Sequence, residues 1–359
     1  ESDSVVEKKA ELRIYMDNDP TDSLIPVTIL TGFLGAGKTT LLKRLLREDH
    51  GHRIAVIENE FGEVGIDDIL LADAVGGRPI VEMNNGCICC TVRDDLIRIL
   101  DDLAIRRASG SIAFERVVIE TTGLADPAPV AQTFFTDERV ADVYRLDGLV
   151  TLVDAVHAHK QLDTHDAARE QVGFADRLIL SKTDLVDAAA AEDLCSRLRA
   201  MNPQAPILKA AFGDIPVDAV LDINGFELDA ILALEPDFLN SDAHHHHDDI
   251  GSFVYRAEKA FDRERFEQTI EQLIGEYGDN LLRYKGVMHI KDEPLRSVLQ
   301  GVHRLIGSTL DSAWPAGETP ASTLVFIGRD LPHHVFREHL DACLVIESPD
   351  ALLIEEAMK

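Results

Sequence analysis

A glycine-rich loop at residues 32–40 carries the residue types and spacing that bind phosphate. It fits the pattern of glycine, four residues, glycine, lysine and serine or threonine. Its glycines let the backbone turn tightly, so that N–H groups can point at an anion. Lys38 can reach the β- and γ-phosphates of a nucleotide, and the Thr39 hydroxyl can ligate Mg²⁺. The predicted nucleotide-binding loop comprises Gly32, Phe33, Leu34, Gly35, Ala36, Gly37, Lys38, Thr39 and Thr40.

A second motif pairs an acid with a glycine after an apolar run at residues 117–119. Glu120 ends the run, and Gly123 follows three residues later. In P-loop nucleotide hydrolases an acid at such a strand end holds Mg²⁺ directly or through water, and the glycine N–H senses the γ-phosphate. Glutamate is longer than the usual aspartate, so a water-mediated contact is expected. We expect Lys38, Thr39 and Glu120 to contribute to catalysis.

A third motif, Ser-Lys-Thr-Asp at residues 181–184, resembles the guanine-specificity motif Asn-Lys-x-Asp. A carboxylate at Asp184 matches the two adjacent donors of guanine, and adenine offers no such pair. The Lys182 stem can lie along the plane of the base. Ser181 stands where asparagine is usual and loses one amide contact. The motif predicts binding of GTP and GDP rather than ATP.

Three cysteines crowd into the stretch Asn-Asn-Gly-Cys-Ile-Cys-Cys at residues 84–90. Thiolates are soft ligands suited to Zn²⁺, so Cys87, Cys89 and Cys90 predict a metal site. A redox role is the alternative, although a disulfide between the adjacent Cys89 and Cys90 would be strained.

Two further charged or histidine-rich stretches have ambiguous roles. Residues 58–68 include five acids, which form either a solvated loop or a source of oxygen ligands for a metal. Residues 244–247 are four consecutive histidines, which either gather metal ions or form a neutral linker.

Composition limits the classes of function. The 359 residues contain 35 Lys and Arg against 64 Asp and Glu, a formal charge of −29, which argues against binding to nucleic acid or to anionic membranes. No run of about twenty apolar residues appears, so no membrane span is expected. The N-terminal stretch has no apolar signal core, and the clustered cysteines suit a metal better than a disulfide framework. We therefore expect a cytoplasmic protein.

These motifs lie between short apolar runs that alternate with helical patterns, which predicts a doubly wound, mostly parallel α/β sheet. Expected strands cover residues 27–30, 54–57, 117–119, 149–153, 178–180 and 207–208; expected helices cover 93–107, 130–135 and 188–201. Beyond residue 250 we expect strands at 252–255, 281–290 and 323–327 and helices at 263–275 and 335–343. The predicted organisation is a loose acidic arm (1–24), a nucleotide-binding domain (25–223), a His/Asp-rich linker (224–250), a smaller α+β domain (251–345) and a tail (346–359).

Taken in order, these motifs resemble the CobW-type metallochaperone GTPases, which are P-loop GTPases. The resemblance covers residues 25 to 345, and Gly-Cys-Ile-Cys-Cys beside an intact phosphate loop is its most specific part. It implies a P-loop GTPase domain, a CobW C-terminal domain, a client metalloprotein and a homodimer that depends on nucleotide or metal. In some members the metal ligands match Glu58, Glu63 and Cys89, and other members use all three thiolates.

The hypothesis that follows is a metal switch driven by GTP and Mg²⁺. No residue stands out as a general base or an arginine finger, so slow turnover is expected. The metal is expected to be Zn²⁺, with Co²⁺, Ni²⁺ and Fe²⁺ suited to similar ligands. The rival hypotheses are a nucleotide-dependent thiol enzyme and a zinc store or sensor with slow GTPase activity.

Overall fold

The computed structural model describes residues 13–15, 24–48, 51–58, 80–82, 92–223, 249–315, 317 and 319–345. The chain divides into two compact units. The N-terminal unit comprises Asp17–Ser252 with Ile327–Arg329, and the C-terminal unit comprises Glu1–Met16, Phe253–Phe326 and Asp330–Lys359. No helix among the described residues has the length and apolar character needed to cross a bilayer.

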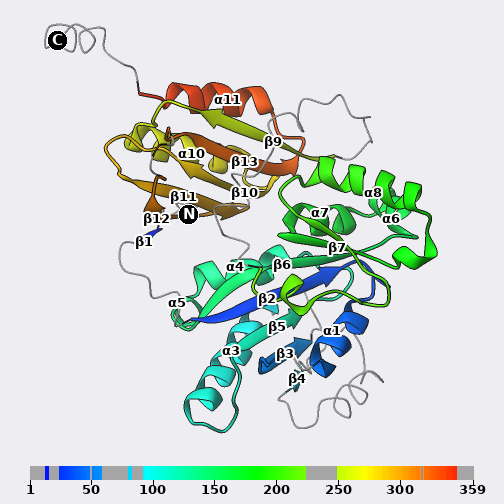
Figure 1. Cartoon of the computed structure of the whole chain (residues 1–359). Coiled ribbons are helices and arrows are strands. Elements are labelled where there is room, and N and C mark those ends of the chain that lie inside the picture. The colour runs from blue at the N-terminus through cyan, green and yellow to red at the C-terminus, as the bar shows by residue number, and fades with distance from the viewer. Residues whose placement is uncertain are drawn as a thin grey trace, which may run out of the picture. The chain divides into compact units, whose positions relative to one another are not determined.

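The N-terminal unit is built on a seven-stranded sheet in the order β4-β3-β5-β2-β6-β7-β8, and the pairs in it are parallel (Figure 1). Its strands are β2 (Ile25–Gly32), β3 (Ile54–Glu58), β4 (Ile80–Glu82), β5 (Arg116–Glu120), β6 (Tyr144–Asp154), β7 (Arg177–Ser181) and β8 (Ile207–Lys209). The central strands are continuous apolar runs because helices cover both faces of such a sheet. Strand β2 lies between β5 and β6. The strands that follow β2 in the chain are first added on one side of it (β3 to β5) and then on the other (β6 to β8), so the strand order switches sides at β2. Ligands of open α/β sheets bind at the carboxyl ends of the strands beside such a switch point.

Helices connect these strands. They are α1 (Lys38–Arg47), α3 (Val92–Ala108), α4 (Ala128–Thr136), α5 (Glu138–Ala141), α6 (Ala158–Thr164), α7 (Asp166–Phe174) and α8 (Ala188–Met201), with short 3₁₀ turns η2 (Thr183–Leu185) and η3 (Val217–Ala219). The Asp187 side chain caps α8 by accepting the N–H of Ala190. Helix α1, in contrast, begins after Gly37 with no side-chain cap. Its first N–H groups therefore suit an anion.

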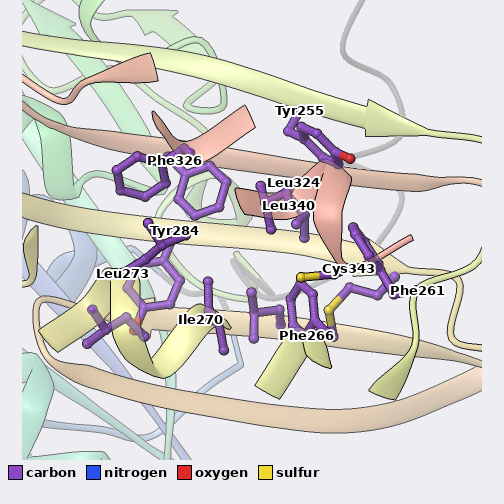
Figure 2. Close-up of a cluster of buried hydrophobic side chains, with 14 of the residues drawn as sticks. Tyr255, Phe261, Phe266, Ile270, Leu273, Tyr284, Leu324, Phe326, Leu340 and Cys343 are labelled. Carbon is purple, nitrogen blue, oxygen red and sulfur yellow. The ribbon is translucent and has the colours of Figure 1, made fainter. Parts of the chain in front are cut away.

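The C-terminal unit contains a six-stranded sheet in the order β1-β12-β11-β10-β13-β9. Its strands are β1 (Arg13–Tyr15), β9 (Ile250–Ala257), β10 (Leu281–Met288), β11 (Leu295–Val302), β12 (Leu305–Ala313) and β13 (Ser322–Arg329), and its helices are α10 (Arg263–Tyr277) and α11 (His333–Ala342). Aromatic side chains such as Tyr255, Phe261 and Phe326 pack with aliphatic ones in the core of this unit (Figure 2). The Phe326 ring lies 5.1 Å from the rings of both Phe253 and Phe336.

The expected fold class, a parallel α/β domain followed by a smaller α+β domain, is confirmed. The structure adds strands that the sequence analysis did not expect, including β11 and β12. Strand β1 lies inside the stretch expected as a loose arm and pairs in parallel with β12. Residues 224–248, which include the histidine tract, lie outside the described residues, as does the tail from residue 346.

Candidate nucleotide and metal site

The phosphate loop turns at three glycines that no other residue type could replace without strain. Gly32, Gly35 and Gly37 have φ angles of 141°, 77° and 100°, in the region that L-residues rarely adopt. A Cβ on Gly32 would also lie 2.4 Å from the carbonyl oxygen of Leu152. The loop therefore joins β2 to α1 in the conformation expected from the sequence.

Lys38 is the first residue of α1, and its ammonium group contacts the backbone of the phosphate loop. Its Nζ donates to the carbonyl oxygen of Gly32 at 2.7 Å, and the residue is 8% exposed. Burial lowers the pKa of Lys38, and the nearby Glu120 carboxylate partly offsets this. The ammonium is thus held where a phosphate bound by the loop would meet it.

Thr39 and Glu120 supply the oxygens expected beside the phosphates. The Thr39 Oγ1 donates to Glu120 Oε1 at 3.2 Å, although the residues are 81 positions apart in the chain. Strand β5 delivers Glu120 because it pairs with β2, with Leu30 opposite Glu120. A hydroxyl and a carboxylate form the hard-oxygen donor set that Mg²⁺ prefers. These two residues therefore fit a magnesium ion.

Glu58 lies on the other side of β5, at the carboxyl end of β3. Its Cα is paired in register with that of Glu120. Successive strands lie about 4.8 Å apart, so the two glutamates end adjacent strands at the same edge of the sheet. The first residue of the acidic stretch predicted to bind metal is thus adjacent to the residue predicted to serve Mg²⁺.

The turn after β5 packs closely on the phosphate loop. A Cβ added to Gly123 would lie 2.7 Å from the backbone nitrogen of Leu34, so only glycine fits. Gln171 of α7 holds this turn, because its Nε2 donates to the carbonyl oxygens of Ala125 at 3.0 Å and Gly123 at 3.3 Å. Sequence analysis did not find Gln171, since nothing but the tertiary fold brings α7 to this turn.

The predicted guanine-binding loop follows β7. Ser181 Oγ donates to the carbonyl oxygen of Ala36 at 2.7 Å, so the serine connects this loop directly to the phosphate loop. Lys182 adopts a left-handed backbone with φ 56°, and its Nζ donates to Asp154 Oδ2 at 2.6 Å. Asp184 is exposed in η2, with its carboxylate available to a ligand.

Phe212 is a further candidate that the motifs did not indicate. The ring is 81% exposed, and its backbone φ of 52° is left-handed. The neighbouring Ala210 carbonyl accepts from Thr183 Oγ1 at 3.2 Å, and a Cβ on Gly213 would lie 3.6 Å from Leu41 Cα. Phe212 therefore lies in a segment between the Asp184 loop and the start of α1. The signal available in the sequence was a phenylalanine directly before a glycine, shortly after the strand expected at residues 207–208.

The predicted metal ligands are only partly described. Glu58 is half-buried at the end of β3, whereas Glu63, Cys87, Cys89 and Cys90 lie outside the described residues. Within the described part of the chain, no group of three or more His, Cys, Asp or Glu side chains is arranged to hold a metal ion. Cys195 and Cys343 are free thiols whose pKa values are raised by burial. They are packed in the two cores and do not belong to this site.

A glycine-rich loop joins the central strand β2 to α1, whose first turn has no side-chain cap, and a threonine and an acid lie beside the loop. This arrangement defines a P-loop nucleotide-binding protein. Comparison with known families agrees. Residues 26–209 match the CobW/HypB/UreG nucleotide-binding domain, and residues 250–344 match the cobalamin synthesis protein cobW C-terminal domain. The chain belongs to the CobW/HypB/UreG family.

Two curated relatives cover most of the chain. The zinc chaperone YjiA of Escherichia coli is 45% identical over 87% of this chain and 96% of its own. The zinc-regulated GTPase metalloprotein activator 1 of Schizosaccharomyces pombe is 32% identical over 89% of this chain and 85% of its own. The crystal structure of Zn(II)-bound YjiA GTPase from E. coli matches with a TM-score of 0.71 and 40% identity, over 90% of this chain and 99% of that one.

Proposed function

We propose that this chain is a GTPase that hydrolyses GTP to GDP and phosphate and couples the reaction to binding Zn²⁺ and delivering it to a client protein. One observation carries the proposal. Glu58 and Glu120 end adjacent parallel strands in register, and Glu120 accepts a hydrogen bond from Thr39 of α1. The names of the relatives, a zinc chaperone and a zinc-regulated GTPase activator, support both halves of this function.

In the proposed reaction a water molecule attacks the γ-phosphorus, and the bond between this phosphorus and the GDP oxygen breaks. The loop N–H groups and Lys38 stabilise the negative charge that spreads over the transferring phosphoryl group. Mg²⁺, when bound, would neutralise charge on the β- and γ-phosphate oxygens. Thr39 would hold it directly and Glu120 through water. Turnover is expected to be slow unless a partner or a second copy of the chain completes the site.

Base recognition is assigned to the loop after β7. The exposed Asp184 carboxylate accepts the ring N–H and the amine of guanine, and the Lys182 stem lies along the base. Ser181 fixes the distance between this loop and the phosphate loop through its bond to Ala36. The Gly123 N–H, in the turn that packs on Leu34, is the expected sensor of the γ-phosphate.

Zn²⁺ is the cargo in the proposed function. Its expected ligands are Cys89 with Glu58 and Glu63, or the three thiolates of Cys87, Cys89 and Cys90. Thiolates favour Zn²⁺, and Co²⁺, Ni²⁺ or Fe²⁺ are the alternatives. Because Glu58 and Glu120 end adjacent strands, exchange of the nucleotide beside Glu120 can alter the position of Glu58, the expected metal ligand on β3. The client and a nucleotide- or metal-dependent homodimer follow from the family and are expectations.

The proposal is tested by comparing phosphate release from GTP and ATP in wild type and in Lys38→Ala. GTP should be hydrolysed in preference to ATP, and the variant should lose most of its activity. Lys43→Ala, which removes a lysine from α1 outside the loop, is the matched control and should hydrolyse GTP at the wild-type rate.

Zinc binding is measured on the same proteins loaded with GDP or with a non-hydrolysable GTP analogue. Wild type should bind Zn²⁺ with an affinity that differs between the two states. Lys38→Ala should bind Zn²⁺ with one affinity whichever nucleotide is added. If the protein hydrolysed ATP in preference to GTP, and if bound metal did not protect its thiols from modification, the rival hypothesis of a thiol enzyme would be favoured. If the zinc affinity of Lys38→Ala, and its dependence on nucleotide, equalled those of wild type, the rival hypothesis of a zinc store would be favoured.

A further inference from the structure

We infer that Asp154 is a positioning residue for base recognition, which fixes the Lys182 ammonium and so orients the lysine stem beside Asp184. The inference rests on the proposed binding of guanine nucleotides and concerns a residue that no motif in the sequence indicates. Asp154 is the last residue of β6, and its Cα is in register with that of Ser181 on β7. The chain therefore brings it to the loop that carries Lys182.

Both carboxylate oxygens of Asp154 are engaged within the protein. Oδ2 accepts from Lys182 Nζ at 2.6 Å and from His157 Nδ1 at 2.9 Å. Oδ1 accepts from the backbone N–H of Val156 at 2.9 Å. The Asp154 side chain is 2% exposed. A carboxylate this enclosed and this fully used does not offer an oxygen to a metal or a substrate, so its effect on a ligand must pass through a partner.

Lys182 is the partner whose position matters for a ligand. It immediately precedes η2, which carries Asp184, and its side chain is 34% exposed while its ammonium is bound to Asp154. The methylene stem of Lys182 is therefore held at both ends, by the backbone and by the bond of the ammonium to Asp154. This stem is the part expected to lie along the base. Fixing it before the ligand arrives removes an entropic cost of binding.

The charge on Asp154 supports this role. Burial alone would raise the pKa of Asp154, but the hydrogen bonds from Lys182, His157 and the Val156 N–H hold it below its usual value. The carboxylate is therefore ionised at neutral pH and forms a charge-assisted bond with Lys182.

The alternative is that the ion pair does no more than join β6 to the loop after β7. A double-mutant cycle separates the two roles. Asp154→Asn, Lys182→Met and the double variant are compared by calorimetric titration with GDP and ADP in Mg²⁺ buffer, and the melting temperature of each is recorded. Each single variant should bind GDP about tenfold more weakly, the effect expected for one lost charge-assisted hydrogen bond. The double variant should bind GDP no more weakly than Lys182→Met alone.

His157→Ala is the matched control. It removes another donor from the same Asp154 oxygen and leaves the Lys182 pair in place, so its GDP affinity should equal that of wild type. Lys182→Arg tests the pair without altering the buried carboxylate. It should retain most of the affinity that Lys182→Met loses, because arginine can still bind Asp154.

In a wild type that prefers GDP to ADP, any of three results would overturn this inference and leave the proposed function standing. The first is wild-type GDP affinity in Asp154→Asn, and the second is losses that multiply in the double variant. The third is an equal loss of GDP affinity in Lys182→Arg and Lys182→Met. A wild type that binds GDP and ADP equally would instead overturn the proposed guanine specificity, and this inference with it.

Discussion

At the scale of single residues, one serine hydroxyl joins the loop after β7 to the phosphate loop. Ser181 is buried and donates to Ala36 at 2.7 Å. Ser181→Ala should lower the stability of the protein by about 1 kcal/mol, the cost of one such bond, and weaken GDP binding several-fold because the two loops lose their fixed spacing. Urea unfolding and GDP titration measure the two effects.

Ser196→Ala provides the comparison for this variant. Its hydroxyl donates to the Glu192 carbonyl oxygen on the exposed side of α8. It should leave GDP affinity and stability at wild-type values. If Ser181→Ala lost stability but kept full GDP affinity, the hydroxyl would serve the fold and not the site.

Phe212 is the second residue whose role can be tested directly. Because the ring is 81% exposed, Phe212→Ala should leave the melting temperature unchanged. If the ring stacks on the base, GDP binding should weaken by about 1–3 kcal/mol, the usual value of an aromatic stacked on a nucleobase. Fluorescence titration with a labelled GDP measures this. Ile105→Ala, at a 68% exposed position on α3, is the control, and equal affinity in the two variants would exclude a stacking role.

These residues show which parts of the site can be predicted from the sequence and which cannot. The phosphate loop and the Thr39–Glu120 pair follow from motifs, because each motif carries its own strand and turn. Asp154 and Phe212 carry no motif. They reach the site because β6 and β8 end at the same sheet edge as β2 and β7, which is a property of strand order. Strand order depends on long-range pairing that local patterns do not encode.

At the scale of elements, α7 supports the turn after β5 through one amide. Gln171 is 1% exposed and donates to two backbone carbonyls of that turn, at Gly123 and Ala125. Gln171→Ala would leave both carbonyls without this donor, so the free energy of unfolding should fall by about 2 kcal/mol. The loss of support should also reduce the preference for a GTP analogue over GDP, because Gly123 is the expected sensor of the γ-phosphate.

The control for this prediction is Gln268→Ala, whose amide donates to Glu264 on the exposed face of α10. It should change the free energy of unfolding by less than about 0.5 kcal/mol, as is usual for surface positions. If Gln171→Ala and Gln268→Ala had the same free energy of unfolding in urea and the same preference for the GTP analogue over GDP, α7 would not support the turn.

The elements of the C-terminal unit show which strands the sequence does not reveal. β10 and β13 are continuous buried runs and were expected. β11 and β12 mix polar and apolar residues, and glycines interrupt both. They form strands because they pair with each other, for example with Val298 opposite Thr309, and because β11 also pairs with β10. The three residues of β1 are too few to give a periodic pattern and depend entirely on β12.

At the scale of the whole molecule, nucleotide and metal are proposed to act on one another across a single sheet edge. Coupling between two ligands is reciprocal in free energy. If a GTP analogue changes zinc affinity by some factor relative to the nucleotide-free protein, zinc must change affinity for the analogue by the same factor. Typical couplings lie at about 5- to 150-fold, well within the reach of titration.

Glu58→Gln tests whether this coupling passes through the end of β3. The change is nearly isosteric and removes a charge next to Glu120 in the strand register. Zinc should bind more weakly, and the zinc affinities of the GDP and GTP-analogue states should become equal, while GDP affinity stays close to wild type. Glu115→Gln removes a charge from the surface pair with Arg53 and should preserve both the zinc affinity and its dependence on nucleotide. A Glu58→Gln protein that kept the full nucleotide dependence of zinc binding would show that the coupling takes another route.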